Sequence, residues 1–314
     1  MQIQFYKANG HDRTLAPKDL AKLRISADSL LWINGTSAEI AALPLPEALA
    51  DAFAMHDPAM ETVRVHDSFY TLSIPVLSFP GEESSGALSL IVGQDWLLSV
   101  GEGVATDFEA FIDHDVGETM KGKLSGSTLA VALIADHFGR VHHRIASINR
   151  EIDRMEERVL TGREGRNTLQ VMAVLRRQVS RLRELIDSLR GTVHALTRPD
   201  FLPEMAGEDR AHFMHLQAGF ERLEDEVARV RDTVVASFDL YATRVAQDTN
   251  RLVRTLTFFT IGIGLVGALA GVFGMNFKVA LFEKGEQGFF LAAWIMAGIL
   301  IVTAAVALVS YRRP

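Results

Sequence analysis

The spacing of apolar residues divides the chain into three regions, of which residues 1–126 are the least regular. Short apolar runs of strand composition alternate there with turn residues, and two segments show helical spacing. The expected strands lie within 28–35, 62–79, 87–93 and 95–101, and the expected helices within 43–55 and 106–115. Thr106 is the expected N-cap of the second helix, with Glu109 at the capping-box position. This alternation predicts a mixed α/β domain.

From Ser127 onward, apolar residues recur three and four positions apart, which is the spacing of amphipathic helices. Two long helices are expected at 127–160 and 167–196, separated by the sequence TGREG. Because the break is short, the two helices should be antiparallel neighbours. The second region, residues 127–200, is therefore predicted to be a helical pair.

A third helical pattern begins near Glu208 and continues without a proline as far as Pro314. It predicts one helix of about 65 residues, about 100 Å long at 1.5 Å per residue. Its first part, residues 201–254, is charged and should lie in water. Its second part is apolar, so the same helix should pass from the aqueous domain into a membrane.

Two segments near the C-terminus, 255–277 and 287–311, contain no charged residue. About 20 apolar residues in a helix cross a hydrocarbon core of about 30 Å, and both segments are long enough. The sequence therefore predicts two transmembrane helices, joined by an extracytoplasmic loop at 278–286 and followed by a basic tail at 312–314. This is the pattern of a multi-pass integral membrane protein.

Charge next to the spans predicts the orientation of the chain. Arg251 and Arg254 precede the first span, and Arg312 and Arg313 follow the second. The loop carries two lysines and two glutamates. Arginine at both outer ends favours a cytoplasmic location for both termini. The N-terminus has no apolar h-region of a signal peptide, which favours the same location in a cell (inner) membrane.

Composition excludes several classes of function. The 314-residue chain has a net charge of −7 and lacks a basic stripe with interleaved aromatic residues, which argues against nucleic-acid binding. It has no cysteine, so disulfides and thiolate metal sites are excluded. The sequence shows no pairing of a nucleophile with a base that would indicate an enzyme, and no resident cofactor is expected.

One face of the first span is polar or bare. Eight residues alternate spacings of three and four, so they share one helix face: Asn250, Val253, Thr257, Thr260, Gly264, Gly267, Gly271 and Gly274. We call this face the glycine stripe. It permits two readings: close packing of two helices, for which Gly267-x-x-x-Gly271 is the minimal signal, or a ring of copies around a water-filled pore. The polar groups of Asn250, Thr257 and Thr260 favour the pore, because lipid would not satisfy them.

The first span ends in Gly274-Met275-Asn276, followed by a short loop, a final span and a basic tail. In this position the tripeptide resembles the GMN signature of the CorA family of divalent cation transporters. The sequence Asp248-Thr249-Asn250-Arg251 also resembles the stretch at which that family's pore helix meets the membrane. The resemblance covers the whole chain in architecture and residues 248–313 in motif.

The resemblance implies a funnel-shaped homopentamer that moves Mg²⁺, and also Co²⁺ or Ni²⁺, with the membrane potential as driving force. Five copies of Asn276 would form a polar ring at the outer mouth, where carboxamide oxygens accept hydrogen bonds from a hydrated ion. It further implies that Val253 and Leu256 form a hydrophobic constriction, and that Asp239 binds a regulatory metal between subunits.

Some residues depart from the family pattern and leave zinc open as the transported ion. The loop FKVALFEKGEQG is nearly neutral and lacks proline, and Leu265 stands where many members have a proline. These departures leave open a ZntB-like zinc transporter, with proton coupling as one form of it. Glu208, His212 and His215 share one helix face and are candidate zinc ligands, although a polar face of a long surface helix is the simpler explanation. A membrane-tethered sensor or scaffold is the alternative outside transport.

Overall fold

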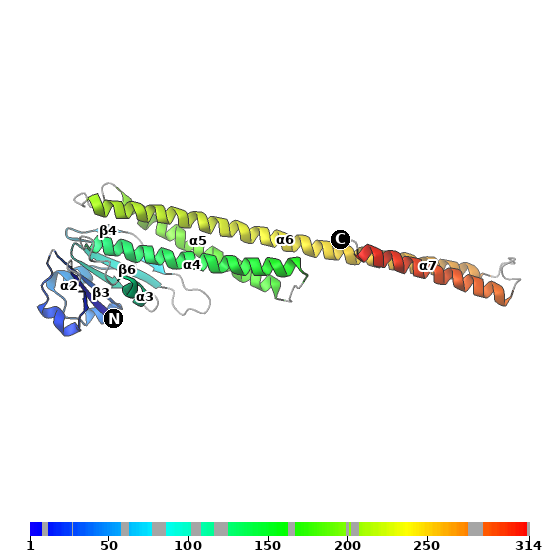
Figure 1. Ribbon diagram of the computed structural model, residues 1–314, viewed down its shortest axis with the longest axis horizontal. Coiled ribbons are helices and arrows are strands. Elements are labelled where there is room, and N and C mark those ends of the chain that lie inside the picture. The colour runs from blue at the N-terminus through cyan, green and yellow to red at the C-terminus, as the bar shows by residue number, and fades with distance from the viewer. Residues whose placement is uncertain are drawn as a thin grey trace. The chain divides into compact units, whose positions relative to one another are not determined.

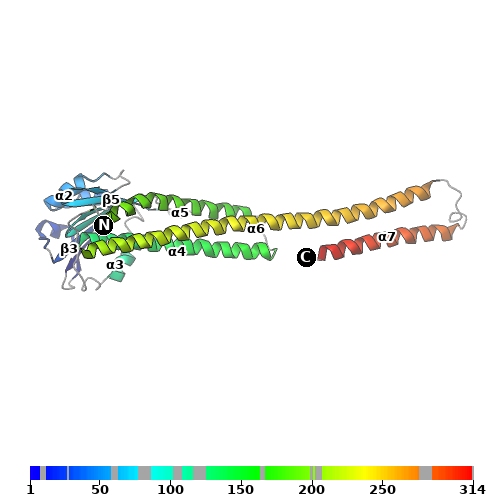
Figure 2. The ribbon, with the colours of Figure 1, turned by 90° about the horizontal axis from the view of Figure 1, so that it is seen from above.

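The computed structural model describes residues 1–7, 12–26, 28–57, 63–76, 86–101, 108–115, 125–162, 167–198, 201, 207–275 and 285–312. It separates into two compact units, which are described in turn (Figures 1 and 2). The first unit contains Met1–Met155 and Gly165–Val235. The second contains Glu156–Glu164 and Ala236–Pro314.

A seven-stranded sheet is the centre of the first unit. The strands are β1 (Gln2–Lys7), β2 (Arg13–Thr14), β3 (Ser29–Gly35), β4 (Arg64–Val65), β5 (Phe69–Val76), β6 (Gly86–Gly93) and β7 (Trp96–Val100). Their order is β2-β1-β3-β7-β6-β5-β4. The β3–β7 pair is parallel and the other pairs are antiparallel. The four strand-rich runs of the sequence are confirmed, whereas β1 and β2 were not predicted.

Short helices connect the strands: η1 (Pro17–Lys22), α1 (Ser37–Ala41), α2 (Glu47–Ala54) and α3 (Glu109–Asp115). The helix expected after Pro46 is confirmed as α2. The capping box of this unit lies at α1, where Thr36 and Glu39 cap each other reciprocally, and the sequence analysis missed it. The N-cap expected at Thr106 lies outside the described residues.

A chain of buried polar side chains crosses the sheet. Trp32 Nε1 donates to Ser99 Oγ over 2.9 Å, and Ser99 Oγ donates to Asn34 Oδ1 over 2.9 Å. Asn34 Nδ2 then donates to Gln2 Oε1 over 3.2 Å. Because each buried group has a partner, the desolvation cost of these polar atoms is offset. This series of hydrogen bonds fixes the register of β1, β3 and β7.

Three long helices complete the first unit: α4 (Gly126–Leu160) as far as Met155, α5 (Thr168–Thr197), and the first part of α6 (Gly207–Gly274). They lie side by side in Figures 1 and 2, and the predicted helical pair is confirmed as α4 and α5. Tyr70 of β5, Phe201 and Phe213 of α6 form an edge-to-face aromatic series with centroid separations of 5.2 and 5.9 Å. This series fastens the helices to the sheet.

The second unit contains the end of α4, the rest of α6, and α7 (Glu286–Arg312). Helix α6 is continuous over 68 residues, which confirms the single long helix expected from the sequence. Both α6 and α7 contain a segment long and apolar enough to cross a membrane, and only 6% and 11% of those segments are buried. Such exposure distinguishes them from the core helices of a soluble protein.

Candidate functional site

One face of the apolar half of α6 is covered by α7. The contact centres on Gly262, which is buried, while the side chain of Thr303 lies directly above it. A Cβ atom added at Gly262 would lie 2.6 Å from Thr303 Oγ1 and 3.0 Å from Thr303 Cβ. The partly buried positions of α6 follow the same face: Arg251, Thr255, Phe258, Val266 and Leu269. This covered face fixes how α6 is turned relative to α7.

The glycine stripe lies on the opposite side of α6. At about 100° per residue, its centre is about 180° from the centre of the covered face. Every residue of the stripe, from Asn250 to Gly274, is exposed. A Cβ atom added at Gly264, Gly267, Gly271 or Gly274 would meet no described atom within 4 Å. Close packing between the two helices of one chain therefore does not explain these four glycines of the stripe.

Apolar side chains occupy the two flanks between the stripe and the covered face. One flank, about 90° from the stripe, carries Leu252, Leu256, Phe259 and Ile263, which are 49–67% exposed. The other flank, about 100° to the opposite side, carries Ile261, Leu265 and Val272, which are 49–55% exposed. A helix in a closed ring needs this division: one face to the axis, two to its neighbours and one outward.

Leu256 lies on a flank, about 60° from the centre of the stripe. The sequence placed it with Val253 at a constriction, and the two residues are 67% and 57% exposed. Val253 lies at the centre of the stripe, whereas Leu256 lies at its edge, in the direction of Gly274. Both residues therefore stay predictions for the constriction.

The threonines of the stripe have their hydroxyl protons satisfied within the helix. Thr257 Oγ1 donates to the Val253 carbonyl over 2.8 Å, and Thr260 Oγ1 donates to the Leu256 carbonyl over 2.9 Å. These two hydroxyl protons would therefore be satisfied in lipid as well, so they do not by themselves require a pore. What remains exposed is the acceptor side of each oxygen, which can accept hydrogen bonds from water around a cation.

Charged residues mark the base of the apolar segment. Asp248 lies 3.5 Å from Arg244 Nε and 3.8 Å from Arg251 Nη1, so one carboxylate is shared between two guanidinium groups. Such pairs hold the arginines at the helix surface, next to the first stripe residue, Asn250. They lie at the surface and are only partly buried, so their contribution to stability is small.

The end of the stripe is only partly described. Gly274 closes α6 and Met275, which is 53% exposed, follows it. Asn276, the expected selectivity residue, lies outside the described residues. The regulatory candidate Asp239 is exposed on α6.

The candidate zinc ligands His212 and His215 are also exposed on α6, and the side chain of Glu208 lies outside the described portion. Within that portion, no three histidine, aspartate or glutamate side chains gather as metal ligands. His142 of α4 pairs with Glu226.

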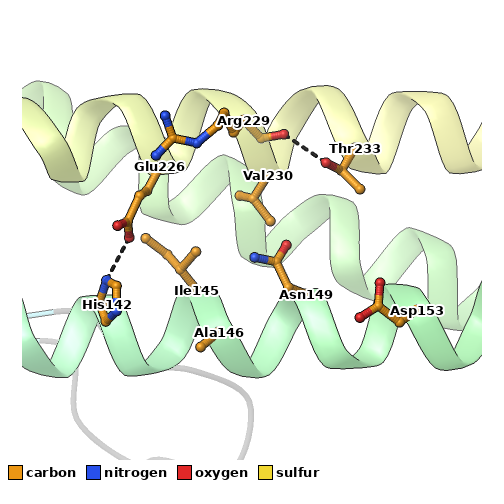
Figure 3. Close-up of a pocket in the computed structure, with 9 residues that line it drawn as sticks. All are labelled: His142, Ile145, Ala146, Asn149, Asp153, Glu226, Arg229, Val230 and Thr233. Carbon is orange, nitrogen blue, oxygen red and sulfur yellow. Dashed lines mark hydrogen bonds and ion pairs between the residues drawn. The ribbon is translucent and has the colours of Figure 1, made fainter.

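A groove of about 480 Å³, lined by both polar and apolar side chains, lies between α4 and α6 in the first unit (Figure 3). At one end His142 Nδ1 is 2.7 Å from Glu226 Oε2, and at the other end lie Asn149, Asp153 and Thr233. Asp153 is three helical turns from His142, so the two cannot share one ion. The groove holds an interhelical ion pair and lacks a third ligand there.

Comparison with known proteins decides the family. The CorA-like Mg²⁺ transporter protein family matches residues 39–312. The chain belongs to this family. It is 25% identical over 288 residues to the cobalt/magnesium transport protein CorA of Thermotoga maritima, covering 86% of this chain and 80% of that protein. It is 23% identical over 181 residues to the CorA protein of Methanocaldococcus jannaschii, covering 57% of this chain and 55% of that protein.

Solved structures of similar fold extend over the entire chain. The complete CorA magnesium transporter of M. jannaschii aligns with a TM-score of 0.72 at 16% identity, covering 98% of this chain and 97% of that one. Full-length CmaX aligns with a TM-score of 0.70 at 19% identity, covering 99% and 97%. The α/β domain, the long helices and the two C-terminal helices are therefore the architecture of the CorA fold.

Proposed function

We propose that this CorA-family protein is a divalent cation channel, built as a homopentamer in which five copies of α6 surround a water-filled axis. The observation that carries the proposal is the glycine stripe, which is exposed on the side of α6 opposite α7. In a ring, that position becomes the lining of the axis. The apolar flanks would contact the neighbouring α6 helices, and α7 would lie outside toward lipid.

The stripe suits an ion that keeps its water. Glycines leave room for a hydrated ion, and the Thr257 and Thr260 oxygens can accept hydrogen bonds from its hydration shell. Mg²⁺ loses water reluctantly, so a wide polar passage fits it better than a tight cage of ligands. Five Asn276 carboxamides at the outer mouth, and the Gly274 carbonyls below them, would supply further acceptors. We therefore propose Mg²⁺ as the main ion, with Co²⁺ and Ni²⁺ also carried.

The membrane potential is sufficient to drive entry. A dication moving to the negative side gains about 4.6 kcal/mol per 100 mV, twice the value for one charge. The proposal places both termini in the cytoplasm of a cell with an inner membrane. Val253 would close the resting pore by dewetting. Metal bound near Asp239 between subunits would hold that state.

Zinc is the second candidate ion, favoured by the neutral outer loop. A ring that keeps the ion hydrated discriminates weakly among dications of similar size. The selectivity between Mg²⁺ and Zn²⁺ is therefore measured by competing the two ions in a flux assay. Mg²⁺ uptake that persists in excess Zn²⁺, without a proton gradient, would support the main proposal. Zn²⁺ movement that requires a proton gradient would support the alternative.

The test is voltage-driven Mg²⁺ uptake into proteoliposomes by the full chain and two carboxamide variants. Asn276→Ala should assemble normally and lose at least 10-fold in uptake, because the polar ring at the mouth is removed. Gln287→Ala removes an exposed carboxamide at the start of α7 and should stay within twofold. Absence of flux for every dication, from a well-assembled oligomer, would favour the sensor or scaffold reading.

A further inference from the structure

Among the glycines in the apolar half of α6, Gly262 is the one at which an added Cβ would meet α7, and the atoms it would meet belong to Thr303. Gly262 is the only buried position of α6 between Arg251 and Met275 whose side-chain position is described. Thr303 is half-buried on α7, and its Oγ1 donates to the Ile299 carbonyl over 2.8 Å. The hydroxyl proton therefore belongs to α7 itself. What Thr303 presents to α6 is the bulk of a β-branched side chain.

This bulk fits only a glycine. A Cβ atom at position 262 would lie 2.6, 3.0 and 3.2 Å from Thr303 Oγ1, Cβ and Cγ2. Rotating the threonine cannot relieve all three contacts, because its own Cβ is too close and does not move with χ1. β-Branched side chains are also restricted to few rotamers in helices. A larger residue at 262 must therefore displace one helix by about 1 Å, toward the usual carbon–carbon separation of about 4 Å.

The fully buried positions of α7 are small residues. Gly288, Ala292 and Ala307 are buried at spacings that place them on the Thr303 side of α7. Small residues allow close helix packing and define a single preferred orientation. Met296 and Ile299, which are partly buried, lie on the same side of α7, and Thr303 is the residue of that side that fills the space above Gly262.

We infer that Gly262 and Thr303 are positioning residues that fix the rotation of α6 about its own axis, and thereby aim the glycine stripe at the pore. They lie about 180° from the stripe and would not touch the ion. A shift of about 1 Å at a helix radius of about 5 Å turns the helix by about 10°, or moves it away from α7. Larger residues at 262 would turn the stripe further and bring an apolar flank toward the axis. The inference rests on the proposed function.

The experiment measures which face of α6 is wet in the full-length oligomer in proteoliposomes. The chain has no cysteine, so a single introduced thiol reports without background. Thr260→Cys lies on the stripe and Ile261→Cys lies at the same depth on a flank. Each is labelled with a charged methanethiosulfonate reagent, and the ratio of the two labelling rates reports the rotation of the helix.

In the wild-type background, Thr260→Cys should react at least 10-fold faster than Ile261→Cys. Adding Gly262→Val should reduce that ratio at least threefold, and adding Thr303→Gly should restore it, because the three crowded atoms are removed. The control is Gly298→Val on α7, where an added Cβ meets no described atom within 4 Å. It should leave the ratio unchanged.

The outcomes separate the inference from the proposed function. An unchanged ratio in Gly262→Val overturns the positioning role. The same conclusion follows if Gly262→Val fails to assemble and Thr303→Gly does not rescue it, since the contact would then not be the limiting feature. Equal labelling of the two thiols in the wild-type background overturns the wet stripe itself, and with it the proposed pore.

Discussion

His137 of α4 should make the first unit sensitive to mild acid. The imidazole is 9% exposed, and its Nε2 atom is buried without a hydrogen-bond partner among the described residues. Burial lowers the pKa of His137 to about 4, the nearby Arg140 lowers it further, and Asp136 opposes the shift. The folded protein therefore holds this residue in its neutral form.

The sign follows from the two pKa values. The unfolded histidine titrates near 6.5 and the folded one near 4, so between these values the unfolded state binds more protons. Stability conferred by the neutral form is present above pH 6.5 and is lost as the pH falls toward 4. Between pH 7 and pH 5 the loss is about 2 kcal/mol at 1.36 kcal/mol per pKa unit.

The assay is urea unfolding of the full chain in detergent at pH 7 and pH 5, followed by the fluorescence of Trp32 and Trp96. Both tryptophans lie in the sheet of the unit that contains His137. The pH dependence of the free energy of unfolding should be about 2 kcal/mol smaller in His137→Leu than in the wild type. His143→Leu, at an exposed neighbouring position, should retain the wild-type dependence.

Equal pH dependence in the wild type and in His137→Leu would refute this reasoning. It would mean that the imidazole is solvated, or that it has a partner in the folded protein that accepts the proton. A smaller pH dependence of the free energy of unfolding in His143→Leu would also contradict it, because the effect would then not come from His137 alone.

Two further predictions concern the first unit. Gly126→Ala should destabilise it by about 2 kcal/mol or more in the same unfolding assay. The added Cβ would lie 2.6 Å from the Trp96 carbonyl oxygen, and a backbone atom cannot move away without disturbing the sheet. Unchanged stability would show that α4 can shift. Ser99→Ala should lower the free energy of unfolding by about 2 kcal/mol, because Trp32 Nε1 and Asn34 Oδ1 each lose a buried partner. The control Ser188→Ala, on the outer part of α5, should cost much less. An equal cost in the two variants would contradict the role of the buried hydrogen-bonded series.

The sequence was most informative where one period extends over many residues. Long uninterrupted helices are readily predicted, because amphipathic spacing over 30 or more residues fits few other secondary structures. Helix α6 was therefore expected at nearly its observed length. Strands β1 and β2 were missed, since Gln2–Lys7 alternates only weakly and Arg13–Thr14 is two residues long. β2 pairs with β1 and β1 pairs with β3, and the β1–β3 pairing depends on distant residues that the local pattern does not report.

The stripe could be found from sequence, but its surroundings could not. Spacing places Asn250 to Gly274 on one face, yet whether α7 covers that face depends on packing between helices. Gly262 illustrates the difficulty. It is one of several glycines in the span, and nothing in its local sequence distinguishes the residue against Thr303 from those on the stripe.

The central claim is that ions pass along the glycine stripe, and blocking that face tests it most directly. Mg²⁺ uptake by Thr260→Cys and Ile261→Cys oligomers is measured in proteoliposomes before and after a bulky methanethiosulfonate reagent is added. The account predicts that uptake by Thr260→Cys falls at least 10-fold while uptake by Ile261→Cys changes less than twofold. Unaltered uptake by fully labelled Thr260→Cys oligomers would contradict it.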